Sequence, residues 1–187
     1  MPSSSSTLQA IAVIETASIA RGFVVADAAV KRAPVTVKVA RPVSPGKFLL
    51  IFGGGVEVTA ESLEAARITA GSDVVDELFL PGAHPSLLPA IEAALVPAAG
   101  EAIAFVETNS VASTIAAADV ALKAVDVVVP RMRLAVGLGG KGWFSIAGSL
   151  ADVEAAVSAV RQSAHPDRLV AIELIAQPHP ELRGFLA

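Results

Sequence analysis

The most constraining feature of this 187-residue sequence is an internal duplication. The hexapeptide IAVIET at 11–16 returns as IAFVET at 103–108, which is 92 residues later (103 − 11 = 92). Because insertions accumulate in loops, a spacing that changes in small steps along the chain indicates a duplicated domain. The further pairs are Asp27/Asp119, Lys31/Lys123 and Arg41/Arg133 at 92, Lys47/Lys141 and Arg67/Arg161 at 94, Glu77/Glu173 at 96, and HPSL at 84–87 with HPEL at 179–182 at 95.

In each copy, segments with apolar residues at strand spacing and at helix spacing follow one another in the same order. This predicts the order β-α-β-β-α-β. This order is typical of a ferredoxin-like unit, in which two helices cover one face of a mainly antiparallel sheet. We therefore expect an α+β chain of two tandem ferredoxin-like domains, at 8–92 and 101–187, with a short helix and linker at 84–100. In the first copy we expect a strand at 8–14, a helix capped by Ser18 and ended before Pro34, strands at 35–40 and 47–52, a helix at 60–70 and a strand at 74–80. Ser110 caps the matching helix of the second copy.

Composition limits the classes of partner. The chain is 53% hydrophobic and 17% charged, yet its longest uncharged runs are the 14 residues 1–14 and the 14 residues 78–91. A membrane-spanning helix needs about 20 apolar residues, so no membrane partner is expected. The apolar surplus instead predicts burial between subunits of an oligomer. A formal charge of −4 argues against a nucleic-acid partner, which requires a basic face.

Two glycine-lysine stretches, GLGGKG at 137–142 and SPGKF at 44–48, first suggest phosphate binding. A Walker A loop has the pattern GxxxxGK[ST]. Ala135 and Arg41 stand where the first glycine belongs, and Gly142 and Phe48 stand where the hydroxyl belongs. Both stretches also lie between two expected strands rather than before a helix. We interpret them as loops with small side chains, which would allow several copies to approach a common axis.

The remaining polar residues do not assemble into an obvious active site. His84, His165 and His179 have no helical i, i+4 spacing, so no metal site is predicted. Glu15 and Glu107 each stand beside a threonine at the start of a helix, where a carboxylate ordinarily has a structural role. With no tyrosine or cysteine and no visible nucleophile–base pair, we predict no catalytic residues, no cofactor and no enzymatic activity.

The duplicated set of motifs resembles the bacterial microcompartment shell domain over about 8–187. The motifs are IxxxET, a helix ending in DAAVK or DVALK, and paired strands around a glycine-bearing loop. Two copies resemble the tandem-domain, trimer-forming shell proteins, of the non-permuted single-layer type because the IET strand comes first. The resemblance implies a homotrimer that forms a flat pseudohexamer with a central pore for metabolites. It further implies that this tile joins hexameric and pentameric shell proteins around encapsulated enzymes in the bacterial cytoplasm.

The resemblance also assigns residues. It implies a pore lined by Ser44, Pro45, Gly46, Gly137, Leu138, Gly139 and Gly140, and tile-edge contacts by Lys31, Lys123, His84 and His179. The sequence departs from the family at both places. Neither loop has the common KIGSG sequence, and the edge motif PRPH lacks its arginine in PGAH at 81–84 and AQPH at 176–179. Some tandem shell proteins hold an iron–sulfur cluster at the pore through cysteine, which this sequence does not contain.

An alternative from another class remains open at this point. A trimeric ferredoxin-like protein could regulate by binding a small anionic effector in its clefts. It would show saturable ligand binding and would not form sheets. An enzyme of unknown type is a weaker alternative, and neither explains the repeated Lys31 and Lys123 as well as a shell protein does.

Overall fold

The computed structural model describes residues 8–94, 96–98 and 100–186. The chain forms two compact units: the first contains the residues up to Pro42 and Gly46–Pro85, and the second contains Val43–Pro45 and the residues from Ser86 onward. Within the described residues, every helix is too short or too polar to cross a membrane. Each unit is a four-stranded antiparallel sheet with helices, so the predicted α+β, tandem ferredoxin-like architecture is confirmed.

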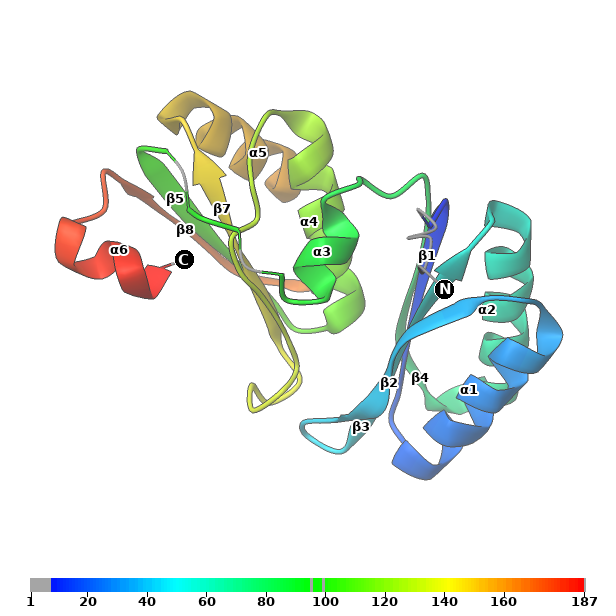
Figure 1. The fold of residues 1–187 in the computed structure, drawn as a ribbon. Helices are drawn as coiled ribbons and strands as arrows, with labels where there is room; N and C mark the ends of the chain where they lie inside the picture. Colours follow the sequence, from blue (N-terminus) through cyan, green and yellow to red (C-terminus); the bar gives the residue numbers. More distant parts are fainter. Residues whose placement is uncertain (1–7, 95, 99, 187) are drawn as a thin grey trace. The chain divides into compact units, whose positions relative to one another are not determined.

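In the first unit the strand order is β2-β3-β1-β4, and β1 pairs antiparallel with both β3 and β4. Helices α1 and α2 lie together on one face of this sheet (Figure 1). The bounds are β1 Ala10–Thr16, α1 Ile19–Arg32, β2 Thr36–Val43, β3 Lys47–Gly54, α2 Val56–Ala70, a 3₁₀ turn Gly71–Asp73 and β4 Val74–Pro81.

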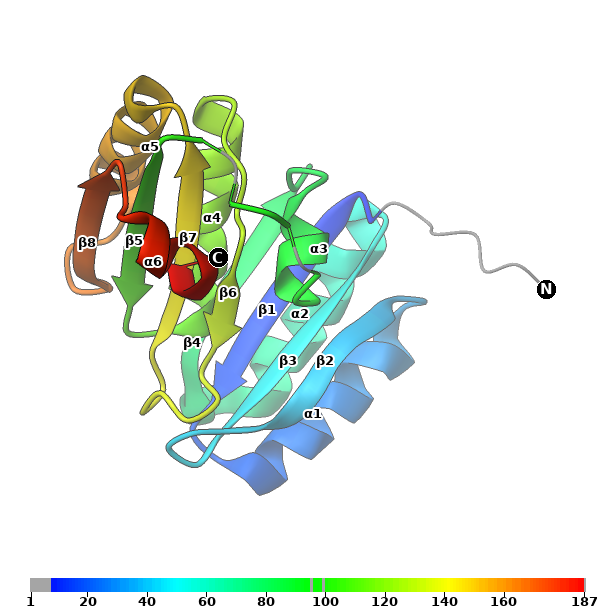
Figure 2. The same cartoon turned by 60° about the vertical axis from the view of Figure 1, so that its left-hand side comes forward.

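The second unit repeats this order as β6-β7-β5-β8. Its helices α4 and α5 lie behind the sheet in Figure 2, and the terminal helix α6 lies on the opposite face. The bounds are α3 Leu87–Ile91, β5 Ala102–Thr108, α4 Val111–Ala124, β6 Met132–Leu134, β7 Gly142–Gly148, α5 Leu150–Ser163, β8 Leu169–Ala176 and α6 Pro180–Leu186.

Serine caps fix the starts of the first helix in both copies. Ser18 Oγ accepts a hydrogen bond from Arg21 N at 3.2 Å, and Ser110 Oγ accepts one from Ser113 N at 3.1 Å. Each satisfies a backbone N–H that has no partner inside its helix. Both predicted caps are confirmed.

The register of the fourth strands corrects one predicted pair. Glu77 lies opposite Ile14, whereas Ile172 lies opposite Val106. Ile14 and Val106 are themselves counterparts (106 − 14 = 92), so the counterpart of Glu77 is Ile172 and not Glu173. The spacing is therefore 95, the same as that of the two HP segments. Since neighbouring residues of a strand point to opposite faces, this single step moves the carboxylate of Glu173 to the other side of the sheet.

The second strand of each copy is less alike than predicted. In the first unit β2 runs unbroken over eight residues, whereas its counterpart contains only the three-residue β6 and an isolated bridge between Val128 and Ala147. Pro130 lies between these two pieces and has no N–H to donate to the sheet. The expectation of a matching continuous strand in the second copy is wrong for this reason.

The contact between the first helix and the sheet is built in opposite ways in the two copies. A Cβ added at Gly22 of α1 would lie 2.3 Å from Phe48 Cβ of β3. A Cβ added at Gly142 of β7 would lie 2.0 Å from Thr114 Oγ1 of α4. Thr114 is the counterpart of Gly22 (22 + 92 = 114), and Gly142 is the counterpart of Phe48 (48 + 94 = 142). The glycine is on the helix in one copy and on the sheet in the other.

Candidate functional site: the two strand-connecting loops

The first candidate loop, Ser44–Gly46, connects β2 to β3. Pro45 and Gly46 are exposed, and Ser44 is partly buried. Gly46 has φ of +98°, a backbone conformation that L side chains rarely adopt. No atom lies within 4 Å of the position that a Cβ would occupy there. Backbone conformation, and not lack of space, therefore requires this glycine.

The second candidate loop, at 135–140, lies between β6 and Lys141, the residue before β7. Left-handed φ values occur at Ala135 (60°), Gly137 (71°), Gly139 (60°) and Gly140 (89°). Two main-chain hydrogen bonds close the loop, from Ala135 N to Lys141 O and from Lys141 N to Leu138 O, each of 3.1 Å. The run of glycines is thus explained by the turn itself. Both loops join two strands of one sheet, as predicted, and neither precedes a helix.

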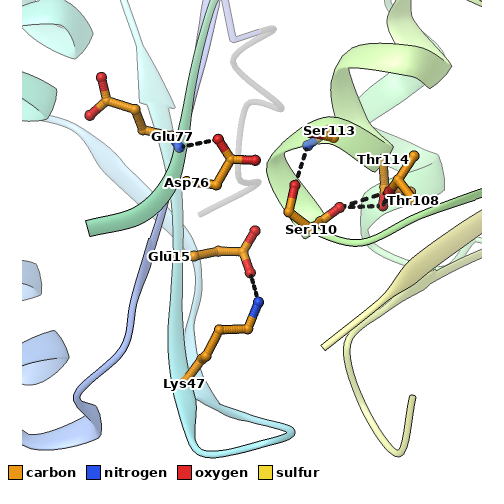
Figure 3. Close-up of polar contacts among 8 residues, drawn as sticks. All are labelled: Glu15, Lys47, Asp76, Glu77, Thr108, Ser110, Ser113 and Thr114. Carbon is orange, nitrogen blue, oxygen red and sulfur yellow. Dashed lines mark hydrogen bonds and ion pairs between the residues drawn. The ribbon is translucent and has the colours of Figure 1, made fainter. Parts of the chain in front are cut away.

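A glutamate–lysine ion pair lies at the base of each loop. Lys47 Nζ lies 2.6 Å from Glu15 Oε2 (Figure 3), and Lys141 Nζ lies 2.7 Å from Glu107 Oε1. Each pair joins the end of the first strand of its unit to the residue that follows the loop. The sequence placed the two glutamates at helix starts, whereas the structure gives each a lysine as partner. The signal available in the sequence was that both residues of the pair recur.

The surroundings of the two pairs differ. The side chains of Lys47 and Glu15 are 13% and 0% exposed, whereas those of Lys141 and Glu107 are 49% and 37% exposed. Both lysine charges are compensated by a carboxylate in direct contact. The loops therefore present main chain, small side chains and the exposed side chain of Val136 beside compensated charge.

Threonine hydroxyls lie at the end of the first strand in both copies. Thr16 Oγ1 donates to Ser18 O at 3.0 Å in the first unit. In the second unit, the hydroxyls of Thr108 and Thr114 lie 2.7 Å apart and each lies 2.8 Å from Ser110 O (Figure 3). All three residues are buried. Their contacts fix the turn that leads into α4 and offer no nucleophile to solvent.

The predicted edge lysines close the last turns of their helices. Lys31 Nζ lies 2.6 Å from Asp27 Oδ2, and Lys123 Nζ lies 2.5 Å from Asp119 Oδ2. Both are i, i+4 pairs, and both lysines remain exposed. The aspartates hold the lysines along their own helices.

The histidines are spread along the chain. His84 follows β4 and is partly buried, whereas His179 is exposed and its Nδ1 accepts from Glu181 N at 3.3 Å before α6. His165 makes a similar turn, with Asp167 N donating to its Nδ1 at 3.3 Å. Within the described part of the chain, three or more histidine, aspartate or glutamate side chains never gather as a metal site would require.

One arginine pair differs between the copies because of the corrected register. Arg67 Nε donates to both carboxylate oxygens of Glu77 at 2.9 Å, and Glu64 also contacts this guanidinium. The hydrogen bond to Glu77 raises the pKa of Arg67, helped by the nearby negative charges. In the second unit Arg161 Nη2 donates instead to the main-chain oxygen of Ile172 at 3.2 Å.

Comparisons with known proteins agree with this duplicated architecture. The sequence model described as the BMC domain matches residues 10–83 and again 102–178. The bacterial microcompartment shell protein PduT of Citrobacter freundii is 40% identical over 175 residues, which cover 93% of this chain and 95% of that protein.

Solved structures give the same result. A crystal structure of a microcompartment protein from Desulfitobacterium hafniense DCB has a TM-score of 0.85 at 37% identity, over 94% of this chain and 98% of that one. The fused permuted hexameric shell protein MSM0275 from the RMM microcompartment has a TM-score of 0.62 at 24% identity, over 82% of each chain. At that identity the second likeness concerns the fold alone.

Proposed function

This chain belongs to the BMC-domain family as a tandem-domain shell protein of bacterial microcompartments, and from that membership we propose that three copies form a pseudohexameric tile with a central pore. The tile is part of the protein shell of a microcompartment in the bacterial cytoplasm. Its six domains (3 × 2 = 6) surround one axis, and the pore passes a metabolite. The role is structural and selective rather than catalytic.

The proposal rests mainly on two matched loops, each of which has a glutamate–lysine ion pair at its base. Each loop joins the second and third strands of a BMC domain, and each is followed by a lysine tied to a glutamate of the first strand. In a ring of alternating domains the two loops alternate around the axis. The rim is then formed by Ser44, Pro45, Gly46, Gly137, Leu138, Gly139 and Gly140.

Selection at such a rim depends on size and hydrogen bonding. Both lysines beside the loops are compensated by carboxylates, so neither contributes a free positive charge. Exposed glycines at 46 and 139 leave main chain accessible to a passing molecule. Pore selectivity from groups of this kind follows the same physics as in channels.

Contacts between tiles involve the two helix ends that carry Lys31 and Lys123, together with His84 and His179 after the fourth strands. Both lysines are exposed and are oriented by an aspartate one turn earlier. Their ammonium groups are thereby directed along the helix for contact with a neighbouring tile. The partners are other shell proteins with hexameric and pentameric tiles, and enclosed enzymes lie behind them.

Solution mass and imaging test the proposal. Light scattering is expected to give three chains of 18.9 kDa, and negative-stain images at higher concentration are expected to show hexagonally packed sheets. A chain that stays monomeric or dimeric and never forms sheets overturns the tile. Saturable binding of a small anion by such a chain would favour the regulatory alternative.

The edge assignment has its own test. Replacing Lys31 and Lys123 together by alanine is expected to abolish or weaken sheets while the trimer mass is unchanged. Arg21→Ala is a matched control, because Arg21 is an exposed cation at the opposite end of α1. Sheets that form unchanged in the double variant would contradict the edge assignment.

A further inference from the structure

Two short helices follow the fourth strands of the two copies. The sequence HPSLLPAI at 84–91 contains α3, and HPELRGFL at 179–186 contains α6. At the spacing of 95 set by the strand register, Leu182 is the counterpart of Leu87 and Phe185 is the counterpart of Ala90. The duplication thus includes these helices as well as the two sheets.

One face of helix α3 is buried although the helix follows the first copy. It lies in the second compact unit, where it packs against β6 and against α4, which is beside it in Figure 1. Leu87 is 0% and Ala90 is 4% exposed. A small hollow of about 70 Å³ separates the end of this helix from residues 129–133. A helix that trails one copy therefore completes the apolar surface of the copy that follows it.

Helix α6 has the same kind of sequence but lacks this cover. Leu182 is 49% exposed and Phe185 is 77% exposed. Arg131 Nη1 donates to the main-chain oxygen of Phe185 at 3.4 Å, so the helix is held to its own unit through its main chain. The ring of Phe185 remains available to another surface.

The matching receiving surface is exposed on the first copy. Phe23 and Val30 of α1 and Val37 of β2 are all exposed. Their counterparts at the spacing of 92 are Ile115, Leu122 and Val129, and all three are buried. The first copy is thus exposed at the positions where the second copy is buried. In the second copy these positions lie on or beside α4 and β6, the elements that α3 contacts.

We propose that α6 of one chain packs on the surface formed by Phe23, Val30 and Val37 of a second copy of this chain. The contact repeats between chains the one that α3 makes with α4 and β6 within a chain. It is head-to-tail, since the donor and the receiving surface are different patches, and such contacts form a ring when the rotation closes. The inference rests on the proposed trimer and names the surfaces that hold it together.

Two complementary apolar surfaces on one chain favour a second copy over an unrelated partner. Exposed apolar groups that form a patch are typical of interaction sites. Here each patch has a buried counterpart elsewhere in the same chain, which shows what kind of element covers it. The mean hydropathy of +0.64 fits a chain whose remaining apolar surface is covered by association.

The absence of cysteine from the chain allows a direct cross-linking test. One chain carries a single cysteine at position 23, 30 or 37, and a second, differently tagged chain carries one at position 182 or 185. The two are co-expressed and oxidised, which gives 3 × 2 = 6 combinations. A disulfide requires Cα atoms within about 7 Å, so at least one combination is expected to give the mixed-tag dimer on a non-reducing gel.

Ile68→Cys is the matched control. Ile68 is an exposed apolar residue on α2 and lies outside the receiving surface. If all six combinations cross-link no more than Ile68→Cys does, while the wild-type chain is a trimer, the inference is overturned and the proposed tile remains. A wild-type chain that is monomeric overturns both.

A second measurement avoids the geometry of disulfides. Leu182→Ser with Phe185→Ser is expected to raise the concentration at which half of the trimer dissociates by at least about tenfold. Both side chains are exposed within the chain, so the circular dichroism spectrum should be unchanged. A double variant that keeps the wild-type dissociation curve contradicts the inference without affecting the pore or the edges.

Discussion

The two halves of this chain have the same strand order and the same serine-capped first helix, yet they fill one contact in opposite ways. In the first half a glycine on the helix, Gly22, receives the ring of Phe48 from the sheet. In the second half the sheet has the glycine, Gly142, and the helix has Thr114. The side-chain volume between the helix and the sheet is therefore set by the pair and not by either position alone.

The halves also place the same ion pair in different surroundings. Glu15–Lys47 is nearly removed from solvent, and Glu107–Lys141 is accessible to it. An exposed pair contributes about 0–1 kcal/mol, whereas loss of one partner from a buried pair leaves an uncompensated charge. Identical residues at matching positions therefore have unequal energetic roles.

The largest effect on stability is expected when Gly22 of the first half is replaced by threonine, the residue at the matching position 114 of the second half. We expect Gly22→Thr to lower the free energy of unfolding of the first unit by about 3 kcal/mol or more, because its Cβ would overlap Phe48. Hydrogen exchange of the β1 amides under increasing urea measures this unit. Ala20→Thr, at an exposed position of the same helix, controls for helix propensity and should cost less than about 1 kcal/mol.

Adding Phe48→Gly to Gly22→Thr recreates the pair of the second half. We expect the double variant to lose at least about 1 kcal/mol less than the sum of the two single losses. The reason is that the threonine then occupies space that the ring has left. Strictly additive losses would show that the two positions are not coupled and would break the comparison.

Removing the carboxylate charge from each ion pair tests the second difference. Glu15→Gln should destabilise the first unit by about 3 kcal/mol, because the mostly buried Lys47 is left without its carboxylate partner. Glu107→Gln should cost less than about 1 kcal/mol in the second unit. The fluorescence of Trp143, the sole tryptophan of the chain, follows unfolding of the second unit. Equal losses in the two variants would show that burial does not distinguish the pairs.

The arginine pairs should differ by a smaller amount. Arg67→Lys loses the two-pronged contact with Glu77 and should cost about 0.5–1 kcal/mol at low salt, whereas Arg161→Lys keeps a donor for Ile172 O and should cost less. Because the pKa of Arg67 is raised, its contribution is full below the unfolded pKa and is lost only as the pH rises through the higher folded value.

Salt is therefore a better probe of Arg67 than pH. The cost of Arg67→Lys is expected to shrink in 1 M sodium chloride, where charges on the surface are screened over about 3 Å. Urea unfolding at both salt concentrations measures it. A cost that does not depend on salt would assign the loss to packing of the arginine stem.

The smallest expected effect is an increase in stability when a helix cap is added to the first unit. Gly55 is the N-cap residue of α2, with φ −64° and ψ 155°. Its counterpart Ser149 is the N-cap residue of α5, with φ −64° and ψ 156°. Only Ser149 provides a side-chain cap, to Asp152 N at 3.2 Å. Gly55→Ser should stabilise the first unit by a few tenths of a kcal/mol, and Ser149→Gly should cost the second unit about the same. An unstable Gly55→Ser variant would indicate that the added hydroxyl fails to reach Val58 N.

The architecture could be predicted well from the sequence, because the duplication gives two separate sequence patterns for each helix and strand. Strands and helices in one copy are supported by the same hydrophobic periods in the other, and the caps Ser18 and Ser110 are predicted correctly. Both loops were correctly placed between strands. These features depend on residues close together in the chain.

What sequence reasoning missed depends on residues that are distant in the chain. The exchange between Gly22 and Gly142 appears as ordinary divergence until the helix is placed on its sheet. The matching glutamates at 77 and 173 suggest that the two are counterparts, and the strand register shows that the counterpart of Glu77 is Ile172. The interruption at Pro130 was the one miss with a local signal, since proline lacks the donor that a sheet needs.

The uncovered glycines of the two loops have a consequence for protein engineering. At Gly46, Gly137 and Gly139 the site of a Cβ has no neighbour within 4 Å, so backbone angle and not packing restricts substitution there. Asparagine, which tolerates such angles, is therefore a suitable first replacement. Since the glutamate–lysine pairs lie outside the loops, new loop sequences can be grafted between them as interchangeable cassettes on an unaltered scaffold.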